Sequence, residues 1–180
     1  MNDKIVQNTQ LEQQKKAVQK QKKRRIIDIQ LAENQHITLM QAALQEAQRA
    51  FAHDEVPIGA VVAHQGRIIA RAHNLVETLC DATAHAEMQA ITAAANFIGG
   101  KYLPDCTLYV TVEPCPMCAA AMYWAQVGTL VYGAADPKRG YLLMAPQVLH
   151  PKTQVLSGVL ENECSVLMKQ FFQKKRKHNN

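Results

Sequence analysis

The sequence predicts an α/β domain in which helices pack in layers against a central sheet. A β-hairpin pattern comes first, helical and strand patterns then alternate, and one helix joins two short apolar strands. This alternation is typical of layered α/β domains. The chain has 180 residues, 48% of them hydrophobic and 19% charged, which is enough for one domain with a substantial core.

The first half of the domain contains a helix and a hairpin. Residues 38–53 carry apolar side chains at three- and four-residue spacing, which indicates an amphipathic helix. Residues 60–63 and 67–72 flank a turn that contains Gly66, and we expect them to form a β-hairpin.

The second half alternates between helices and strands. The alanine-rich residues 83–97 predict a helix, and 108–112 and 129–132 predict short buried strands around a helix at 116–126. A helix between two strands implies a crossover, so we expect the two strands to be parallel. A last helix is predicted at 161–172.

Positive charge is concentrated at the two ends of the chain. Residues 1–35 hold eight Lys or Arg and four acids, and residues 169–180 hold five Lys or Arg and no acid. We therefore predict a basic N-terminal segment at 1–35, a domain at 36–173 and a basic tail at 174–180. Because residues 1–35 have little to bury, we expect them to form a mobile arm or a frayed, exposed helix. Basic ends of this kind bind polyanions or keep a chain soluble.

Cysteine usage and hydropathy suggest a soluble protein of the cytoplasm. The five cysteines are an odd number and two have metal-site spacing, which favours thiolate chemistry in a reducing compartment over disulfides. No apolar run is long enough to span a membrane, and no secretory signal is visible at the start. We expect no membrane partner.

A pair of cysteines marks the predicted metal site. Cys115 and Cys118 follow a strand and open a helix, so both sulfur atoms can lie on one side of its first turn. Pro116 suits an early helical position. The positive end of the helix dipole favours thiolate. A Pro-Cys-x-x-Cys pattern is rare by chance, which makes this signal specific.

His85 is the candidate third ligand and Glu87 the candidate proton carrier. A catalytic zinc takes three protein ligands and leaves one position for water, and a nearby carboxylate is needed to move protons. His53 also begins a His-x-Glu pattern, but it falls at the end of a predicted helix, where the helix dipole disfavours nearby thiolates. His85 falls at the start of a predicted helix, where the dipole favours them. A fourth Cys or His ligand, with Cys80 as a distant candidate, would instead close the site as a structural one.

These motifs resemble the zinc-dependent cytidine and deoxycytidylate deaminase superfamily. His85-Ala-Glu87 and Glu-Pro-Cys115-Pro-Met-Cys118 carry the resemblance. Further strings are similar to bacterial tRNA-specific adenosine deaminases, over about residues 38–175: Glu55-Val-Pro-Ile-Gly, Ala72-His-Asn74, Tyr132-Gly-Ala-Ala-Asp136 and Phe171-Phe172. The resemblance implies a three-layer cytidine-deaminase-like fold with a mixed sheet of about five strands. It also implies deamination of the wobble adenosine of a tRNA anticodon to inosine.

The resemblance also implies roles for individual residues. One Zn²⁺ per subunit would be held by His85, Cys115 and Cys118. Water activated by the zinc would attack C6 of adenine while Glu87 carries the protons. The residues implied on the substrate side are Asn74 against the base, Ile58 in the base pocket and Asp136 near the RNA backbone.

Three positions depart from the resemblance. Ala120 stands where Gly is frequent, Ala135 where a basic residue is frequent before the aspartate, and Cys80 where a polar residue is common. By their residue type, Cys80, Cys106 and Cys164 are expected to act as small buried hydrophobes. Asn74 and Asp136 would, without the resemblance, be interpreted as turn residues.

The predicted partners are an anticodon stem-loop and a second copy of the chain. Four basic residues after two phenylalanines are candidates for RNA phosphates: Lys174, Lys175, Arg176 and Lys177. A homodimer is implied by the resemblance alone. Two other functions remain open, deamination of a free base or nucleoside such as guanine or cytosine, and a non-catalytic binding module stabilised by zinc.

Overall fold

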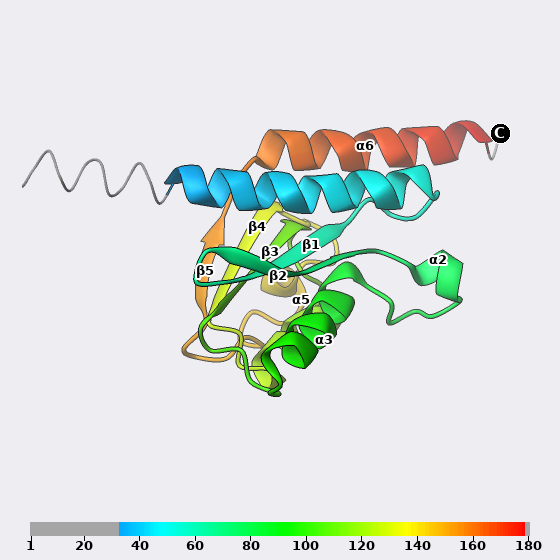
Figure 1. Cartoon of the computed structure of the whole chain (residues 1–180). Helices are drawn as coiled ribbons and strands as arrows, with labels where there is room; N and C mark the ends of the chain where they lie inside the picture. Colours follow the sequence, from blue (N-terminus) through cyan, green and yellow to red (C-terminus); the bar gives the residue numbers. More distant parts are fainter. Residues whose placement is uncertain (1–32, 179–180) are drawn as a thin grey trace, which may run out of the picture. The chain divides into compact units, whose positions relative to one another are not determined.

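The computed structural model describes residues 33–178. The chain divides into two compact units, Met1–Gln35 and His36–Asn180, and the elements below belong to the second unit. Of the predicted N-terminal arm, residues 33–35 are helical and the rest lies outside the described residues. Figure 1 shows the arrangement of the helices and strands.

A mixed sheet of five strands forms the centre of the domain, which confirms the expected number. The strand order is β2-β1-β3-β4-β5. β1 pairs antiparallel with β2 and β3, whereas β3, β4 and β5 run parallel to one another. The strands are β1 (Gly59–His64), β2 (Arg67–His73), β3 (Cys106–Val112), β4 (Thr129–Ala134) and β5 (Gln154–Ser157).

The predicted hairpin is present and its turn explains its register. Gln65 and Gly66 lie between His64 and Arg67, which pair across the turn. Both turn residues have positive φ, 50° at Gln65 and 76° at Gly66. Two-residue turns with this backbone match the twist of the strands that they join, and glycine adopts positive φ at no steric cost.

Helices cover both faces of the sheet and give the three layers that the resemblance implied. One face packs against α3 (Ala86–Ile98) and α4 (Pro116–Trp124) through one apolar cluster. The other packs against the helix at residues 36–52 and against α6 (Glu161–His178) through a second cluster. In Figure 1 these last two helices lie side by side over the sheet, with α3 on the opposite side.

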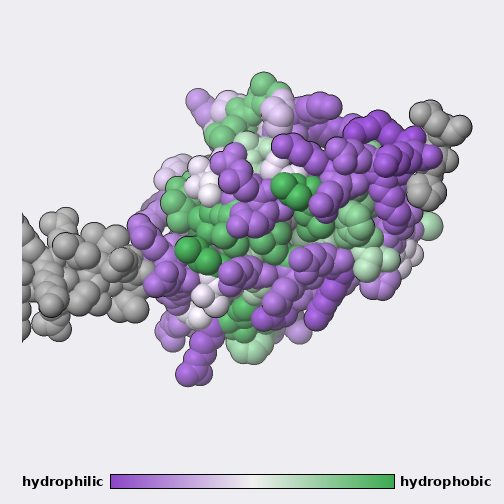
Figure 2. Space-filling view, turned by 90° about the horizontal axis from the view of Figure 1, so that it is seen from above, coloured by the Kyte–Doolittle hydropathy of each residue, from purple (hydrophilic) through white to green (hydrophobic). Residues whose placement is uncertain are grey.

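The last helix is longer than expected. We predicted an end at Phe172, but α6 continues through His178, so Lys174–Lys177 lie on its final turns. No Gly or Pro interrupts this segment, Lys, Arg and Gln are good helix formers, and cations near a helix C-terminus are favoured by its dipole. Seen from the side of α6, the surface is mostly hydrophilic with a hydrophobic strip along the middle (Figure 2).

Three short elements were absent from the sequence prediction: α2 (Val76–Leu79), α5 (Tyr141–Met144) and β5. Each has four residues, too few for a clear hydrophobic period, and all residues of β5 are exposed. Among the helices of the described residues, none is long and apolar enough to cross a membrane.

Candidate active site

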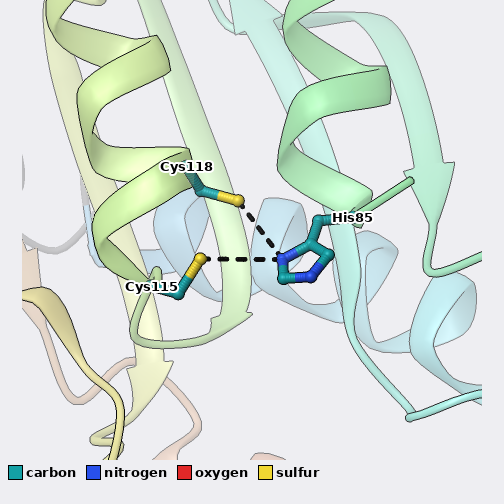
Figure 3. Close-up of side chains that lie close together, drawn as sticks. All are labelled: His85, Cys115 and Cys118. Carbon is teal, nitrogen blue, oxygen red and sulfur yellow. Dashed lines mark hydrogen bonds between the residues drawn. The ribbon is translucent and has the colours of Figure 1, made fainter. Parts of the chain in front are cut away.

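The residues His85, Cys115 and Cys118 come together where two helices begin. His85 is the N-cap of α3, Cys115 is the N-cap of α4, and Cys118 lies in the first turn of α4. Both N-cap residues have extended backbones, and neither side chain bonds to the N–H groups of its own helix. Their side chains are therefore free to turn toward each other (Figure 3).

The distances between the three side chains suit a zinc ion. Nδ1 of His85 lies 3.7 Å from Sγ of Cys115 and 3.5 Å from Sγ of Cys118. Usual Zn–S and Zn–N bond lengths at tetrahedral angles place nitrogen and sulfur about 3.6 Å apart. Within residues 33–178, this is the one group of at least three His, Cys, Asp or Glu side chains close enough to share a metal ion.

The protonation of the two thiols also fits a divalent cation. A hydrogen bond from Cys118, opposed by burial and helped by His85, lowers the pKa of Cys115 to about 4. The same hydrogen bond to Cys115, together with burial, raises the pKa of Cys118, and the bond with Cys115 raises that of His85. Protein groups alone thus stabilise one thiolate, and a divalent cation would supply the charge needed for the second.

Glu87 lies beside the three candidate ligands, in the first turn of α3. Its side chain is buried, and Oε2 has no hydrogen-bond partner among the described residues. Burial raises the pKa of this carboxyl. An unpaired buried carboxylate oxygen is costly, so its presence at a cluster of metal-ligating side chains indicates a place for water or substrate.

Asn74 and Ile58 lie next to each other on neighbouring segments. The Asn74 N–H donates to the Ile58 carbonyl at 3.0 Å, and the Asn74 side chain is buried. The N–H of Leu75 donates to the carbonyl of Ala84, the residue before His85. Nε2 of Gln89, on α3, donates to the carbonyls of His73 and Ala84. These bonds join the Asn74 segment to the start of α3.

Glu55 is a buried residue of this region to which sequence reasoning gave no role. Its carboxylate accepts hydrogen bonds from the Asn74 side chain and from the backbone N–H groups of Glu77 and Thr78. Glu55 begins the motif Glu55-Val-Pro-Ile-Gly, but only its contacts in the folded chain show what it does. The one available signal is the acid pair Asp54-Glu55 directly before the apolar run Val-Pro-Ile-Gly.

Asp136 has the role of a turn residue in the structure. Its Oδ1 accepts hydrogen bonds from the N–H groups of Lys138 and Arg139. Its own N–H donates to Glu113, a buried carboxylate that also accepts from the N–H of Leu142. A Cβ atom on Gly140 would overlap Glu113, so only glycine allows this close approach. Glu113 thus holds the segment after β4 against the strand that leads to Cys115.

Two of the basic residues at the end of α6 are ion-paired. Nζ of Lys175 lies 2.6 Å from Oδ2 of Asp54, and Nζ of Lys174 lies 3.5 Å from Oδ1. The hydrogen bond from Lys175 lowers the pKa of Asp54. Asp54 directly precedes Glu55, so the end of α6 contacts the loop that reaches the Asn74 segment.

The other cysteines and His53 lie away from the cluster. Cys106 and Cys164 are buried as expected, but the expectation was wrong for Cys80, which is exposed at the end of α2. Cys80 has a left-handed backbone, φ 51°, and its sulfur bonds to the carbonyl of Glu77. His53 bonds to the carbonyl of Arg49 and stacks on His73. Neither Cys80 nor His53 is part of the group of side chains that could share a metal ion.

A comparison with protein families assigns most of the described chain to one family. Residues 34–176 match the model of the MafB19-like deaminases. This range contains the three candidate metal ligands and Glu87. It agrees with the deaminase superfamily indicated by the sequence motifs.

Individual relatives agree with this family and are more specific. The tRNA-specific adenosine deaminase of Agrobacterium fabrum is 44% identical over 151 residues, covering 81% of this chain and 98% of the relative. That of Bacillus subtilis is 46% identical over 143 residues, covering 77% and 89%. A structure from a study of A-to-I editing by tRNA:A34 deaminases is 44% identical, with a TM-score of 0.68 and coverage of 72% and 98%. The chain therefore belongs to the MafB19-like deaminase family.

Proposed function

We propose that this protein catalyses the hydrolytic deamination of the wobble adenosine of a tRNA anticodon, which gives inosine. Two curated relatives that match nearly their whole length are tRNA-specific adenosine deaminases, and a similar structure is of a tRNA:A34 deaminase. The observation that carries the proposal is the cluster of His85, Cys115 and Cys118 beside a buried Glu87 oxygen without a partner among the described residues.

In this proposal, His85, Cys115 and Cys118 hold one Zn²⁺ per chain. The nitrogen–sulfur distances support this assignment. When bound, zinc acts as a Lewis acid and lowers the pKa of coordinated water. A metal held by only these three protein ligands would still have room for a water ligand, as in catalytic rather than structural zinc sites.

Glu87 carries the protons of the reaction. It takes a proton from the attacking water and delivers it to N1 of adenine while the water oxygen bonds to C6. The remaining hydroxyl proton then passes through Glu87 to the exocyclic nitrogen, the C6–N6 bond breaks, and ammonia leaves. One water and one adenosine thus give one inosine and one ammonia. We assign Asn74 and Ile58 to binding of the base.

The basic end of the chain supports an RNA substrate. An unpaired loop nucleotide can be extruded into a pocket at low cost, and phosphates around it attract Lys and Arg. We propose that Lys174, Lys175, Arg176 and Lys177 bind phosphates of the anticodon stem, with the 1–35 arm as a second basic segment. The turn at Asp136 lies on the substrate side in this proposal, and the cytoplasm, where tRNA is used, is the site of action.

An exposed apolar surface on α4 and α5 supports a homodimer. Trp124 is 77% exposed, and Leu142, Leu143 and Met144 on α5 are also exposed. Ala120, Tyr123, Trp124 and Val148 line a shallow hollow of about 200 Å³. Apolar patches of this kind are typical of protein interfaces. Because α4 also carries Cys118, a second copy bound there would lie close to the site.

Replacing Cys118 with alanine should remove the metal. We expect zinc, measured by mass spectrometry on purified protein, to fall from one per chain to less than about a tenth, since two ligands bind it weakly. Cys80→Ala is the matched control and should keep its zinc. Normal zinc content in Cys118→Ala, or its loss in Cys80→Ala, would contradict the ligand set.

Replacing Glu87 with glutamine should abolish turnover and leave the zinc in place. The amide keeps the size of the side chain but cannot take up a proton, so inosine formation in an anticodon stem-loop should fall at least about 100-fold. Free guanine is assayed beside the stem-loop. Activity of the wild-type protein on guanine alone would reject the RNA substrate, and an active Glu87→Gln variant would reject the proton carrier.

Neutralising Arg176 and Lys177 together should make RNA binding less sensitive to salt. Each lost phosphate contact lowers the slope of log affinity against log salt by about 0.7 to 0.9. Binding is measured in the Glu87→Gln background to prevent turnover, with Lys101→Gln plus Lys152→Gln as a control of equal charge change. An unchanged slope in the first pair would show that these residues do not contact phosphates.

Replacing Trp124 with glutamate should give a monomer in analytical ultracentrifugation, because a charge at the centre of an apolar interface is costly to bury. Phe97→Glu is the control, since Phe97 is also an exposed aromatic residue (67%) but belongs to α3 rather than to α4 or α5. A wild-type protein that sediments as a monomer at micromolar concentration would contradict the dimer.

A further inference from the structure

Glu55 is a fully buried carboxylate bound entirely by one short segment. Its side chain is 0% exposed. Oε2 accepts from Nδ2 of Asn74 at 3.1 Å and from the N–H of Glu77 at 3.2 Å, and Oε1 accepts from the N–H of Thr78 at 2.7 Å. All three donors belong to residues 74–78, which follow β2 directly and include most of α2.

These hydrogen bonds keep the buried carboxylate ionised. Burial alone would raise the pKa of Glu55, but the bonds from Thr78, Glu77 and Asn74 outweigh it and hold the pKa below its usual value. An ionised carboxylate accepts hydrogen bonds and donates none. When an amide side chain lies against this carboxylate, the NH₂ end of the amide can bond to it and the carbonyl end cannot.

This discrimination fixes the orientation of Asn74. The Asn74 amide must turn its NH₂ end toward Glu55, so its carbonyl oxygen Oδ1 lies on the other side of the amide. The backbone around it is fixed as well, because Leu75 bonds to Ala84 and Gln89 bonds to the carbonyl of His73. Both the position of Asn74 and the direction of its side-chain amide are therefore fixed, in the segment that is bonded to the residue before His85.

The loop that carries Glu55 is itself held from the opposite side. Asp54 is paired with Lys174 and Lys175 of α6. The Glu55 N–H bonds to the carbonyl of Ala50 at the end of the first helix. The carboxylate is therefore attached to the helical layer and not to a free loop.

We propose that Glu55 is a positioning residue of the base pocket. By binding the NH₂ end of Asn74 it makes Asn74 a hydrogen-bond acceptor toward the substrate, and by binding the N–H groups of Glu77 and Thr78 it holds α2 at the pocket rim. This inference rests on the proposed function through the assignment of Asn74 to the base. Glu55 acts through Asn74 and does not touch the reacting atoms.

The first test is Glu55→Gln, which keeps size and shape. With its NH₂ group toward Asn74, the new amide loses the bonds from Asn74 and Glu77, and turned the other way it loses the bond from Thr78. Because an amide, unlike a carboxylate, can present either end to Asn74, the orientation of Asn74 is no longer fixed. We expect kcat/KM for the anticodon stem-loop to fall about 10- to 100-fold, mainly through KM, with zinc content unchanged.

Glu46→Gln is the matched control. Glu46 is a buried glutamate on the first helix, and its partners are the side chains of Arg49, Arg71 and His73. Its replacement should lower the melting temperature and leave KM unchanged. An equal rise of KM in Glu46→Gln and Glu55→Gln would show a general loss of stability and overturn the proposal.

The second test exchanges donor and acceptor between the two side chains. Asn74→Asp alone places a second carboxylate against Glu55 and should be severely impaired. When Asn74→Asp is combined with Glu55→Gln, the new amide can donate to the new carboxylate, which still presents an oxygen to the substrate. We expect this double variant to have a higher kcat/KM than either single variant, although below wild type because the Glu77 N–H loses its acceptor.

The outcomes separate the inference from the proposed function. A wild-type protein that forms no inosine would reject the proposed function before any variant is compared. If wild type forms inosine and the losses of the two single variants simply multiply in the double variant, the two side chains are uncoupled and the role of Glu55 is rejected.

Discussion

The approach of two helix starts at one face of the sheet is the constraint on which the site depends. His85 and Cys115 are each the residue directly before a helix, and α3 and α4 pack against the same face through a shared apolar core. The N-terminal ends bring positive dipoles toward the sulfur atoms, which favours thiolate. Packing of small side chains such as Ala86, Ala90 and Ala119 lets the helices lie close to the sheet. The core therefore determines the distance between nitrogen and sulfur.

Sequence reasoning succeeded where a local pattern has a direct geometric result. The turn at Gln65-Gly66 gives the hairpin, and Cys115 with Cys118 must share one side of a helical turn. The candidate ligands were therefore named in advance, and the structure brings them together. Glu55 had no comparable signal, because its partners Glu77 and Thr78 are backbone groups more than twenty residues away. Backbone donors leave no trace in residue type, so such contacts appear only in three dimensions.

The basic end of the chain illustrates how one residue type can serve two purposes. The composition of residues 174–180 indicated a basic tail that binds phosphates. In the structure α6 continues through this segment to His178, and Lys174 and Lys175 pair with Asp54. Lys175 lies over the ring of Phe171, and Phe171 packs edge-on against Phe51 of the first helix. The final turns of α6 are thus part of the packed domain. Any RNA bound there would be presented to a surface of defined shape, which restricts the orientation of the stem.

The exposure of Cys80 has a practical consequence for following the enzyme at work. Cys106, Cys118 and Cys164 are buried, and Cys115 would be protected by a bound metal. A thiol-reactive fluorophore would therefore attach selectively to the end of α2, two residues beyond Thr78, whose N–H is held by Glu55. A fluorophore can thus be placed beside the segment that Glu55 holds without an engineered cysteine.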